Sequence, residues 1–436
     1  MTFVFDLIYF LIAVGLAPVV VYRMVRYGRY RTGWANRFGR IVRKDPALKK
    51  CIWLHAVSVG EVNASKTIVK EFENTFGDYE IVITVTTDTG FARAASLFGD
   101  KHKVFYFPFD FSRIMRQAFL NIHPSICLLM ELEVWPNFVQ IARELNVPVV
   151  LINGRISDKS FDRYGKIKPI TKKIFRNLSF VLAQTEQYAQ RFRELGCPDR
   201  RVIVTGSLKY DTAQVTDKVE GADVLAAQLG LKKERLWVAG ATGSDEEQII
   251  LDVYKQLKDK FSDLRLAIVP RKPERFDEVA ELIKERGFDF IRYSNIKNGS
   301  QKLKIENRKS KIEIVILGDT MGDLRKFYSL AAIIFVGRSL VPMGGSDMAE
   351  AAALGKCTIF GPHTFNFKQT VDALLAEQGA IMVKDKQELL QMMQKCLAEP
   401  DFAASIARNG REVIRKNQGA TQKTIAQISK FLTRGQ

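Results

Sequence analysis

The segment LHAVSVGEV, residues 54–62, ends an apolar run with a serine, a glycine and a carboxylate. Glu61 follows Ser58 and Gly60 at the point where a helical pattern begins. A carboxylate in the first helical turn stabilises the helix terminus, and the same group can accept a proton from a substrate hydroxyl. Taken alone, the spacing favours a helix-start residue, and a general base is the alternative.

Two further polar clusters follow apolar runs in the same half of the chain. Thr87 lies in TTDTG after the run YEIVITV, and Glu131 and Glu133 follow the run SICLLM. Open α/β sheets bind their ligands beyond the carboxyl ends of parallel strands. We therefore expect these side chains and the Glu61 segment to line one rim of a binding cleft.

Residues that follow strands in the second half of the chain suit an anionic ligand. Ser244 precedes a helical pattern with acidic residues in its first turn, and Arg271 and Arg275 lie beside prolines in VPRKPERF. Backbone N–H groups at a helix start can bind phosphate, and a guanidinium can donate two parallel hydrogen bonds to it. Helix capping by Ser244 and solvated surface arginines are the alternatives.

The segment FVGRSLVPMGGSDMAEAAALGKC joins a strand to a helix through the pair Gly344 and Gly345. Glu350 lies in the first turn of that helix. This pattern predicts a ligand loop in which Glu350 accepts hydrogen bonds from ribose hydroxyls. A helix-start glutamate is again the alternative.

Signatures of several other enzyme classes are missing from the sequence. It contains no DxD, HExxH, GxSxG, GxGxxG or GxxxxGK[ST] motif, and its four histidines and five cysteines show no metal-ligand spacing. These absences disfavour metal-dependent hydrolysis, serine chemistry and nicotinamide or flavin chemistry. We expect neither a metal ion nor a cofactor.

The elements that position these residues alternate between apolar strand-like runs and helical patterns. Such alternation predicts two α/β domains, each with a parallel sheet covered on both faces, and a cleft between the domains as the binding site. The predicted boundaries are a membrane anchor with a basic segment at 1–30, an N-terminal α/β domain at 31–212, a linker at 213–232, a C-terminal α/β domain at 233–415 and a C-terminal helix at 416–436.

The first residues predict a membrane anchor. Residues 3–22 form an apolar run of about the 20 residues that a bilayer-spanning helix needs. Arginines follow, so the positive-inside rule predicts a spanning helix with a short external N-terminus and cytoplasmic domains. An anchor that enters one leaflet is the alternative. The arginines expected against an anionic membrane surface are Arg23, Arg26, Arg29, Arg31, Arg37, Arg40 and Arg43.

The charge of the whole chain agrees with an anionic partner. Lys and Arg number 66 against 48 Asp and Glu, a formal net charge of +18 over 436 residues. Phosphorylated substrates, anionic lipid and nucleic acid would each fit this charge.

Motifs spread over residues 30–415 resemble, in the right order, those of the 3-deoxy-D-manno-octulosonic acid (Kdo) transferases. The motifs are HAVSVGE, TVTTDTG, FPFD, ELEVWPN, LINGRIS, TGSLKYD, GATGSDEE, VPRKPERF, GDTMGDL, FVGRSLVPMGG and GPHTFNF. The resemblance implies a GT-B fold, in which two Rossmann-like α/β/α domains face a cleft, with an N-terminal membrane helix. It implies CMP-Kdo as donor, a lipid A precursor as acceptor, the cell inner membrane as location, and no nucleic acid partner.

The resemblance also implies residue roles. Glu61, in the S-x-G-E motif, corresponds to the family's catalytic base, and the N-terminal domain takes the acceptor. Asp347 in GGSDMAE departs from the asparagine that the family commonly has. Donor contacts are expected at Ser244, Arg271, Gly344, Gly345, Glu350 and Asn366, and acceptor contacts at Ser58, Gly60, Thr87, Glu131 and Glu133.

Two alternative functions remain open at this point. One is a GT-B transferase that uses a UDP-sugar and another lipid acceptor, which UDP-sugars rather than CMP would stabilise against heat. The other is a catalytically inactive, membrane-anchored protein that binds sugar nucleotides. In that case Glu61→Ala would leave function in cells intact.

Overall fold

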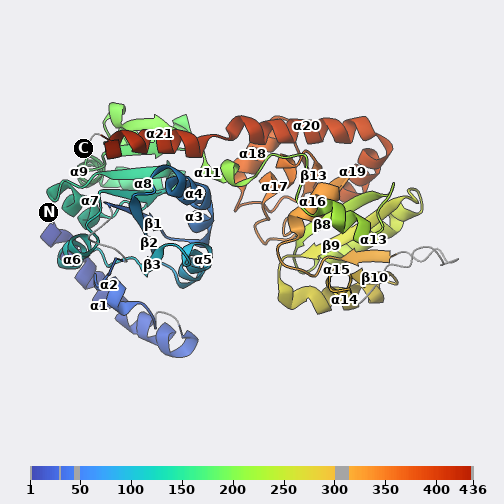
Figure 1. Ribbon diagram of the computed structural model, residues 1–436, viewed down its shortest axis with the longest axis horizontal. Coiled ribbons are helices and arrows are strands. Elements are labelled where there is room, and N and C mark those ends of the chain that lie inside the picture. The colour runs from blue at the N-terminus through green and yellow to red at the C-terminus, as the bar shows by residue number, and fades with distance from the viewer. Residues whose placement is uncertain (1, 29–30, 44–49, 300–313, 434–436) are drawn as a thin grey trace. The chain divides into compact units, whose positions relative to one another are not determined.

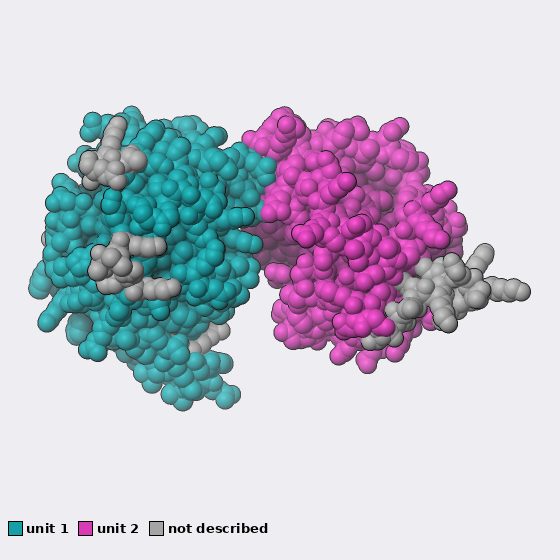
Figure 2. Space-filling model, in the orientation of Figure 1, with its two compact units in different colours: residues 1–212, 417–436 teal, residues 213–416 magenta. Residues whose placement is uncertain are grey.

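The computed structural model describes residues 2–28, 31–43, 50–299 and 314–433. The chain divides into two compact units, coloured separately in Figure 2: unit 1 comprises residues 1–212 and 417–436, and unit 2 comprises residues 213–416. Each unit contains a seven-stranded sheet with helices packed on it (Figure 1). The predicted pair of α/β/α domains is thereby confirmed.

The sheet of unit 1 has the strand order β3-β2-β1-β4-β5-β6-β7, and all its pairs are parallel. Strands buried on both faces read as continuous apolar runs, which explains why ICLLM in β4 is buried throughout. The strands are β1 (Lys50–Ala56), β2 (Tyr79–Val85), β3 (Lys103–Tyr106), β4 (Ile126–Met130), β5 (Val149–Gly154), β6 (Phe180–Ala183) and β7 (Val202–Val204).

Helices cover both faces of this sheet. On one face pack α6 (Ser112–Ile122), α7 (Pro136–Glu144), α9 (Lys168–Phe175) and α10 (Glu186–Glu194). On the other face pack α3 (Val59–Ala64), α4 (Lys66–Thr75), α5 (Asp88–Phe98) and the chain's last helix, α21 (Ala420–Thr433). Shorter or peripheral elements are α2 (Trp34–Arg37), α8 (Asp158–Lys166), η1 (Asp199–Arg201) and α11 (Leu208–Thr212).

Unit 2 repeats this design with the strand order β10-β11-β9-β8-β12-β13-β14. Its strands are β8 (Arg235–Thr242), β9 (Leu264–Pro270), β10 (Asp289–Arg292), β11 (Ile314–Leu317), β12 (Ile333–Val336), β13 (Cys357–Phe360) and β14 (Ile381–Met382). Its helices are α12 (Ala222–Gln228), α13 (Glu246–Lys258), η2 (Pro273–Arg275), α14 (Phe276–Glu285), α15 (Tyr293–Lys297), α16 (Leu324–Leu330), α17 (Met348–Ala353), α18 (Lys368–Ala376), α19 (Lys386–Ala398) and α20 (Pro400–Asn417).

The strand orders locate a switch point in each sheet. In unit 1 the order reverses between β1 and β4, and in unit 2 it reverses between β8 and β12. Chain segments leave neighbouring strands in opposite directions at such a point, so a crevice opens beyond the carboxyl ends of those strands. The segments after these four strands are therefore where a ligand site is expected.

The first helix, α1 (Thr2–Tyr27), belongs to unit 1. It begins beside α6 and α7 and then runs away from the sheet (Figure 1). Among the described residues it is the one helix long and apolar enough to cross a membrane, a test of length and composition only.

Candidate functional site

Glu61 lies in the first turn of α3, directly beyond β1 and next to the switch point of unit 1. The Val57 N–H donates to Oε2 of Glu61 over 2.9 Å, and the Ser58 hydroxyl donates to Oε1 over 2.9 Å. Ser58 is the N-cap, since its Oγ accepts the Glu61 N–H. This reciprocal arrangement is a variant of a capping box. The helix-start interpretation is therefore confirmed, and it fixes where the carboxylate points.

Glu61 also belongs to a group of carboxylates that perturb one another. Burial raises the pKa of Glu61 above its usual value, the Val57 hydrogen bond opposes this rise, and the charge of Glu131 adds to it. Burial raises the pKa of Glu133 to about 7, and the charges of Glu61 and Glu131 add to that rise. The structure thus brings together three acidic residues that lie beyond the neighbouring strands β1 and β4. A carboxylate with a raised pKa is a stronger base near neutral pH.

Glu131 and Glu133 are held in a turn with an unusual backbone. Glu131 has φ of 52°, in the left-handed region that non-glycine residues seldom occupy. The Trp135 indole N–H donates to Glu133 over 3.1 Å, and the Lys209 ammonium lies 4.0 Å from a carboxylate oxygen of Glu131. Such backbone strain persists where surrounding structure enforces it, and it concentrates at functional sites. Sequence reasoning assigned no role to Lys209, although the motif TGSLKYD contains it.

Thr87 and Gly60 differ in what they offer a ligand. The Thr87 hydroxyl donates to the Val57 carbonyl over 2.9 Å and accepts the Gly90 N–H, so Thr87 holds the loop that carries Glu61. Gly60 is exposed, and apart from its chain neighbours and its own helix backbone, a Cβ placed on it would meet within 4 Å only the Ser58 hydroxyl oxygen, at 3.7 Å. Packing within the protein therefore does not require a glycine at position 60.

In unit 2, Ser244 is not the helix cap that one interpretation expected. The N-cap of α13 is Asp245, with φ of 69° and no side-chain hydrogen bond to the helix. Ser244 is half-buried between Gly243 and Asp245. Its hydroxyl remains a candidate donor to a ligand.

Glu246 is a site residue that sequence reasoning did not single out. It is fully buried, and its carboxylate accepts hydrogen bonds from the backbone N–H groups of Gly243, Arg338, Ser339 and Leu340. The last three belong to the loop after β12. One carboxylate thereby joins the two loops that flank the switch point of unit 2. The acidic pair in GATGSDEE was the available signal, but its partner loop is distant in sequence.

The two arginines of VPRKPERF separate in the structure. Arg275 pairs with Glu247 over 2.6 Å and with Glu278 over 2.8 Å, so the prediction that its guanidinium is free to bind an anionic ligand is wrong. Arg271 follows β9, and its side chain is exposed. Burial raises the pKa of Glu350, and the charge of Arg271 opposes part of that rise, so Arg271 and Glu350 lie close enough to interact.

The glycine pair meets the GPHTFNF segment. Gly344 and Gly345 have φ of 89° and 81°, and a Cβ on Gly344 would lie 2.2 Å from the Asn366 side-chain nitrogen. The Asn366 N–H donates to the Gly344 carbonyl over 3.2 Å. Ser346 donates to the Ala241 carbonyl over 3.2 Å and so fastens the same loop to the end of β8. The predicted donor residues Gly344, Gly345 and Asn366 are therefore adjacent.

Asp347 has a structural role that its sequence position did not reveal. It is the N-cap of α17, and its carboxylate accepts the Ala349 N–H over 3.0 Å. Glu350 lies one turn further on, and burial followed by the charge of Asp347 raises its pKa.

Two of the seven arginines between residues 23 and 43 do not face a membrane. Arg37 is buried, donates to the Thr86 carbonyl over 3.1 Å and lies 4.4 Å from the centre of the Tyr106 ring. Arg43 is buried and pairs with Glu80 over 3.1 Å. The expectation that all seven arginines meet anionic head groups is wrong for these two. Arg29 lies outside the described residues, and Arg23, Arg26, Arg31 and Arg40 are exposed.

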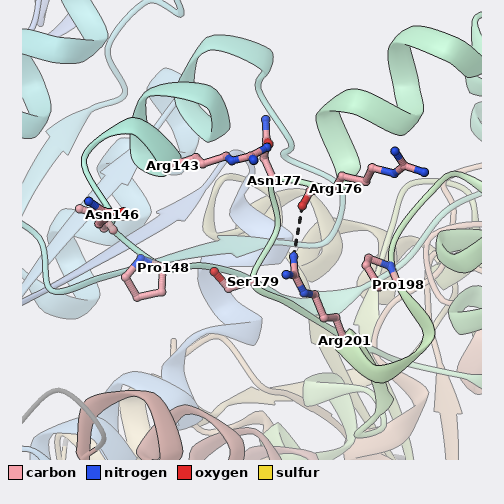
Figure 3. Close-up of a pocket in the computed structure, with 9 residues that line it drawn as sticks. Arg143, Asn146, Pro148, Arg176, Asn177, Ser179, Pro198 and Arg201 are labelled. Carbon is pink, nitrogen blue, oxygen red and sulfur yellow. Dashed lines mark hydrogen bonds between the residues drawn. The ribbon is translucent and has the colours of Figure 1, made fainter.

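Unit 1 also contains a hollow of about 600 Å³, whose lining residues are drawn in Figure 3. Its lining includes Arg143, Arg176 and Arg201, and Arg201 donates to the Arg176 carbonyl over 3.2 Å. These residues precede β5, β6 and β7, so the hollow lies at the amino ends of the strands. It is therefore separate from the Glu61 group. Among the described residues no cluster of His, Cys, Asp and Glu could hold a metal ion.

Comparison with known proteins gives consistent matches along the chain. A family model for 3-deoxy-D-manno-octulosonic-acid transferase (kdotransferase) matches residues 32–212. The 3-deoxy-D-manno-octulosonic acid transferase of Haemophilus influenzae is 33% identical over 411 residues, 94% of each chain. The protein of the same name from Bordetella pertussis is 31% identical over 98% of this chain and 99% of its own.

Solved structures with low sequence identity share the two-unit fold. A glycosyltransferase from Rickettsia africae has a TM-score of 0.55 at 14% identity and covers 88% of this chain and 99% of its own. The UDP-GlcNAc 2-epimerase from Neisseria meningitidis has a TM-score of 0.54 at 13% identity and covers 87% of this chain and 100% of its own. These matches confirm the expected GT-B type of fold.

Proposed function

This chain belongs to the 3-deoxy-D-manno-octulosonic acid (Kdo) transferase family, and we propose that it transfers Kdo from CMP-Kdo to lipid IVA, a lipid A precursor. The reaction is an inverting glycosyl transfer in the biosynthesis of the lipopolysaccharide inner core. The observation that carries the mechanism is the Glu61 carboxylate, which is fixed beyond β1 and has a raised pKa beside two further carboxylates.

Glu61 acts as the general base. Each of its carboxylate oxygens accepts one hydrogen bond from the protein and keeps capacity for a second, from an acceptor hydroxyl. As the hydroxyl oxygen attacks the anomeric carbon of Kdo, its proton passes to Glu61 and the bond from that carbon to CMP breaks. Attack from the face opposite CMP inverts the configuration.

The remaining residues of unit 1 divide between holding the base and binding the acceptor. Ser58 and Thr87 use their hydroxyls within the loop, so they position Glu61. Glu131 and Glu133, the other two carboxylates of the site, contact hydroxyls of the acceptor. The acceptor approaches over Gly60, where the absence of a side chain leaves space.

Unit 2 binds the CMP part of the donor. Arg271 and the Ser244 hydroxyl meet the phosphate, and Glu350 accepts hydrogen bonds from the ribose hydroxyls. Asn366 and the Gly344–Gly345 pair complete the loop around the nucleotide. Charge development on the leaving phosphate is met by Arg271, which is consistent with transfer without a metal ion.

The protein acts at the cytoplasmic face of the inner membrane. Support comes from the apolar surface of α1 and from the exposed arginines that follow its apolar run. A basic surface at this location attracts both anionic lipid and a phosphorylated lipid acceptor.

One experiment tests the proposed reaction. Purified protein is incubated with CMP-Kdo and lipid IVA in detergent, and the lipid is analysed by mass spectrometry. The expected product is lipid IVA carrying Kdo. Absence of that product, with thermal stabilisation by UDP-sugars and none by CMP, would instead favour a transferase with a UDP-sugar donor.

A further inference from the structure

The last residues of β5 depart from regular strand geometry. Leu151 pairs with Val181 and Gly154 pairs with Ala183, so β5 carries one residue more than β6 between these two pairs. Asn153 lies within this bulge and has φ of 53°, in the left-handed region that asparagine tolerates better than most residues. Bulges are over-represented beside active sites, where they change the direction of a side chain.

The backbone on either side of Asn153 holds Glu131. The Glu131 N–H donates to the Ile152 carbonyl over 3.0 Å, and the Arg155 N–H donates to the Glu131 carbonyl over 3.3 Å. Both backbone polar groups of Glu131 are therefore bound to the bulge of β5. Because Glu131 itself has a positive φ, its conformation depends on these partners.

The side chain of Asn153 holds the start of α11. Its Oδ1 accepts the N–H of Leu208, the first residue of α11, over 3.1 Å. At the other end of the helix, Asp211 accepts the Gly419 N–H over 2.8 Å. A helix of five residues is not stable by itself, so tertiary contacts such as these two determine where α11 lies.

The two segments that Asn153 joins carry opposite charges that meet. Lys209 directly follows Leu208, and its ammonium lies 4.0 Å from a carboxylate oxygen of Glu131. The side chains of Lys209 and Glu131 are 37% and 22% exposed, and ion pairs so open to water contribute little energy of their own. The backbone that carries the two residues must therefore set the distance between their charges.

Stability alone does not explain an asparagine at position 153. The residue is 1% exposed, and its Nδ2 has no hydrogen-bond partner among the described residues. A buried donor without a partner destabilises a fold, whereas glycine would adopt the positive φ without burying one. Gln184 donates to the Asn153 carbonyl over 3.0 Å, a bond to the backbone that any residue could accept. What the asparagine side chain adds is the bond from Oδ1 to α11.

We propose that Asn153 is a positioning residue of the acceptor site, which sets the placement of Glu131 relative to Lys209. The inference rests on the proposed function, in which Glu131 contacts a hydroxyl of the acceptor. Asn153 touches no substrate and acts through the two segments that it joins. When its bond to Leu208 is lost, the start of α11 is free to move and Lys209 draws away from Glu131. A misplacement of about 1 Å in an active site can lower a rate about 10²-fold.

Three variants separate this role from a general loss of stability. Asn153→Gly removes the Oδ1 acceptor and adopts the positive φ without strain. Asn153→Asp keeps an oxygen at that position and also tolerates the left-handed backbone. Asn177→Ala is the control, because Asn177 is buried in the same unit and bonds to Arg143 and Gln140, at the amino ends of the strands.

The test measures rates of Kdo transfer over a range of lipid IVA concentrations, together with CMP affinity and thermal melting. In Asn153→Gly we expect kcat/KM for lipid IVA to fall at least tenfold with CMP affinity unchanged, and Asn153→Asp should transfer faster than Asn153→Gly. Asn177→Ala should melt at a lower temperature and keep its kcat/KM. A smaller fall in Asn153→Gly, an equal fall in Asn177→Ala, or no advantage of aspartate over glycine would each overturn the inference.

The pH profile of kcat/KM gives a readout that a loss of stability would not move. Glu61 interacts with the carboxylates of Glu131 and Glu133, and the charge of Glu131 raises the pKa of Glu61. Lys209 is the cation that offsets the charge of Glu131. Its withdrawal should raise the pKa of Glu61 further, so the acid limb of the profile should move to higher pH in Asn153→Gly but not in Asn177→Ala. An unmoved limb in Asn153→Gly contradicts the inference.

A milder variant covers the case in which Asn153→Gly does not fold. Gln184→Met removes the hydrogen bond to the Asn153 carbonyl, so it should lower kcat/KM for lipid IVA at least threefold and move the acid limb in the same direction. Unchanged transfer in Gln184→Met would then overturn the inference. If the wild-type protein itself forms no Kdo product, the proposed function fails; a wild-type product with normal transfer in the variants refutes the role of Asn153 alone.

Discussion

Replacing Glu61 by Gln tests the general base with little change of shape. The Gln amide oxygen can accept the Val57 N–H, and its NH₂ group can donate to the Ser58 oxygen, so both hydrogen-bonding positions stay filled. What is lost is the proton-accepting carboxylate. General base catalysis contributes about 10²- to 10⁴-fold, so the barrier should rise by about 3 to 5 kcal/mol.

The stability of this variant should not fall at neutral pH. Burial and Glu131 raise the pKa of Glu61 in the folded protein, so the ionised form is disfavoured there relative to the unfolded chain. A neutral side chain removes that penalty. The melting temperature of Glu61→Gln at pH 7.5 should therefore equal or exceed that of the wild type.

The assay combines single-turnover transfer of Kdo, CMP titration and thermal melting. Glu73→Gln is the control, because Glu73 lies on the surface of the same unit and pairs with Lys101 and His102 away from the switch point. We expect normal CMP affinity in both variants and loss of transfer in Glu61→Gln alone. Retention of more than about a tenth of the wild-type rate would refute the general base role.

Four further changes test the rest of the site. Gly60→Ala should melt at or above the wild-type temperature, because alanine is favoured over glycine in a helix by about 0.5 to 1 kcal/mol. The rate of Kdo transfer should nevertheless fall at least tenfold, and an unchanged rate would show that no substrate approaches Gly60. Arg271→Ala should weaken CMP binding about 10- to 100-fold by calorimetry, corresponding to a charged hydrogen bond of about 1.5 to 3 kcal/mol, while the neighbouring Lys272→Ala should not; equal affinities would remove Arg271 from the donor site. Glu246→Gln places an NH₂ group against some of the four backbone N–H donors, so it should lower both the melting temperature and CMP affinity; an unchanged melt would contradict the loop-joining role. Burial raises the pKa of Glu133 in the folded protein to about 7, so the protonated side chain stabilises the fold fully at a pH below the pKa that Glu133 has in the unfolded chain, and this stabilisation is lost as pH rises through 7. The free energy of unfolding of the wild type should therefore fall more steeply than that of Glu133→Gln between pH 5 and 8. Parallel profiles of the two proteins, measured by urea unfolding, would show that the pKa is not raised.

Much of the fold was predictable because the signals are local. Apolar runs such as ICLLM mark strands buried on both faces, and the polar residues that follow them mark the ends of those strands. The same reasoning placed Glu61, Glu131 and Glu133 beyond the carboxyl ends of strands in one sheet, and the carboxylates do interact there. The positions of Arg271 and of the Gly344–Gly345 pair after their strands were found in the same way.

The expectations that failed concern side chains whose partners are distant in the chain. The sequence suggested that Arg275 is free to bind an anionic ligand, but in the structure it donates to Glu247, 28 residues away. Arg37 resembled a membrane-facing cation, but it donates to the carbonyl of Thr86, 49 residues away. The sequence does not distinguish a solvated cationic side chain from one that is paired within the protein, because its burial depends on the elements that pack around it.

The sequence by itself determined the α/β class, the two parallel sheets, the apolar first helix and the family to which the chain belongs. Tertiary structure decided which polar residues act together. Glu246 joins loops more than 90 residues apart, and Asp6 reaches Asn137 across 131 residues, to bind α1 to unit 1. It also showed that Glu61 is both a capping residue and a buried carboxylate beside two others. Periodicity and motifs are properties of neighbouring residues, whereas burial and hydrogen-bond partners arise only when distant segments pack together.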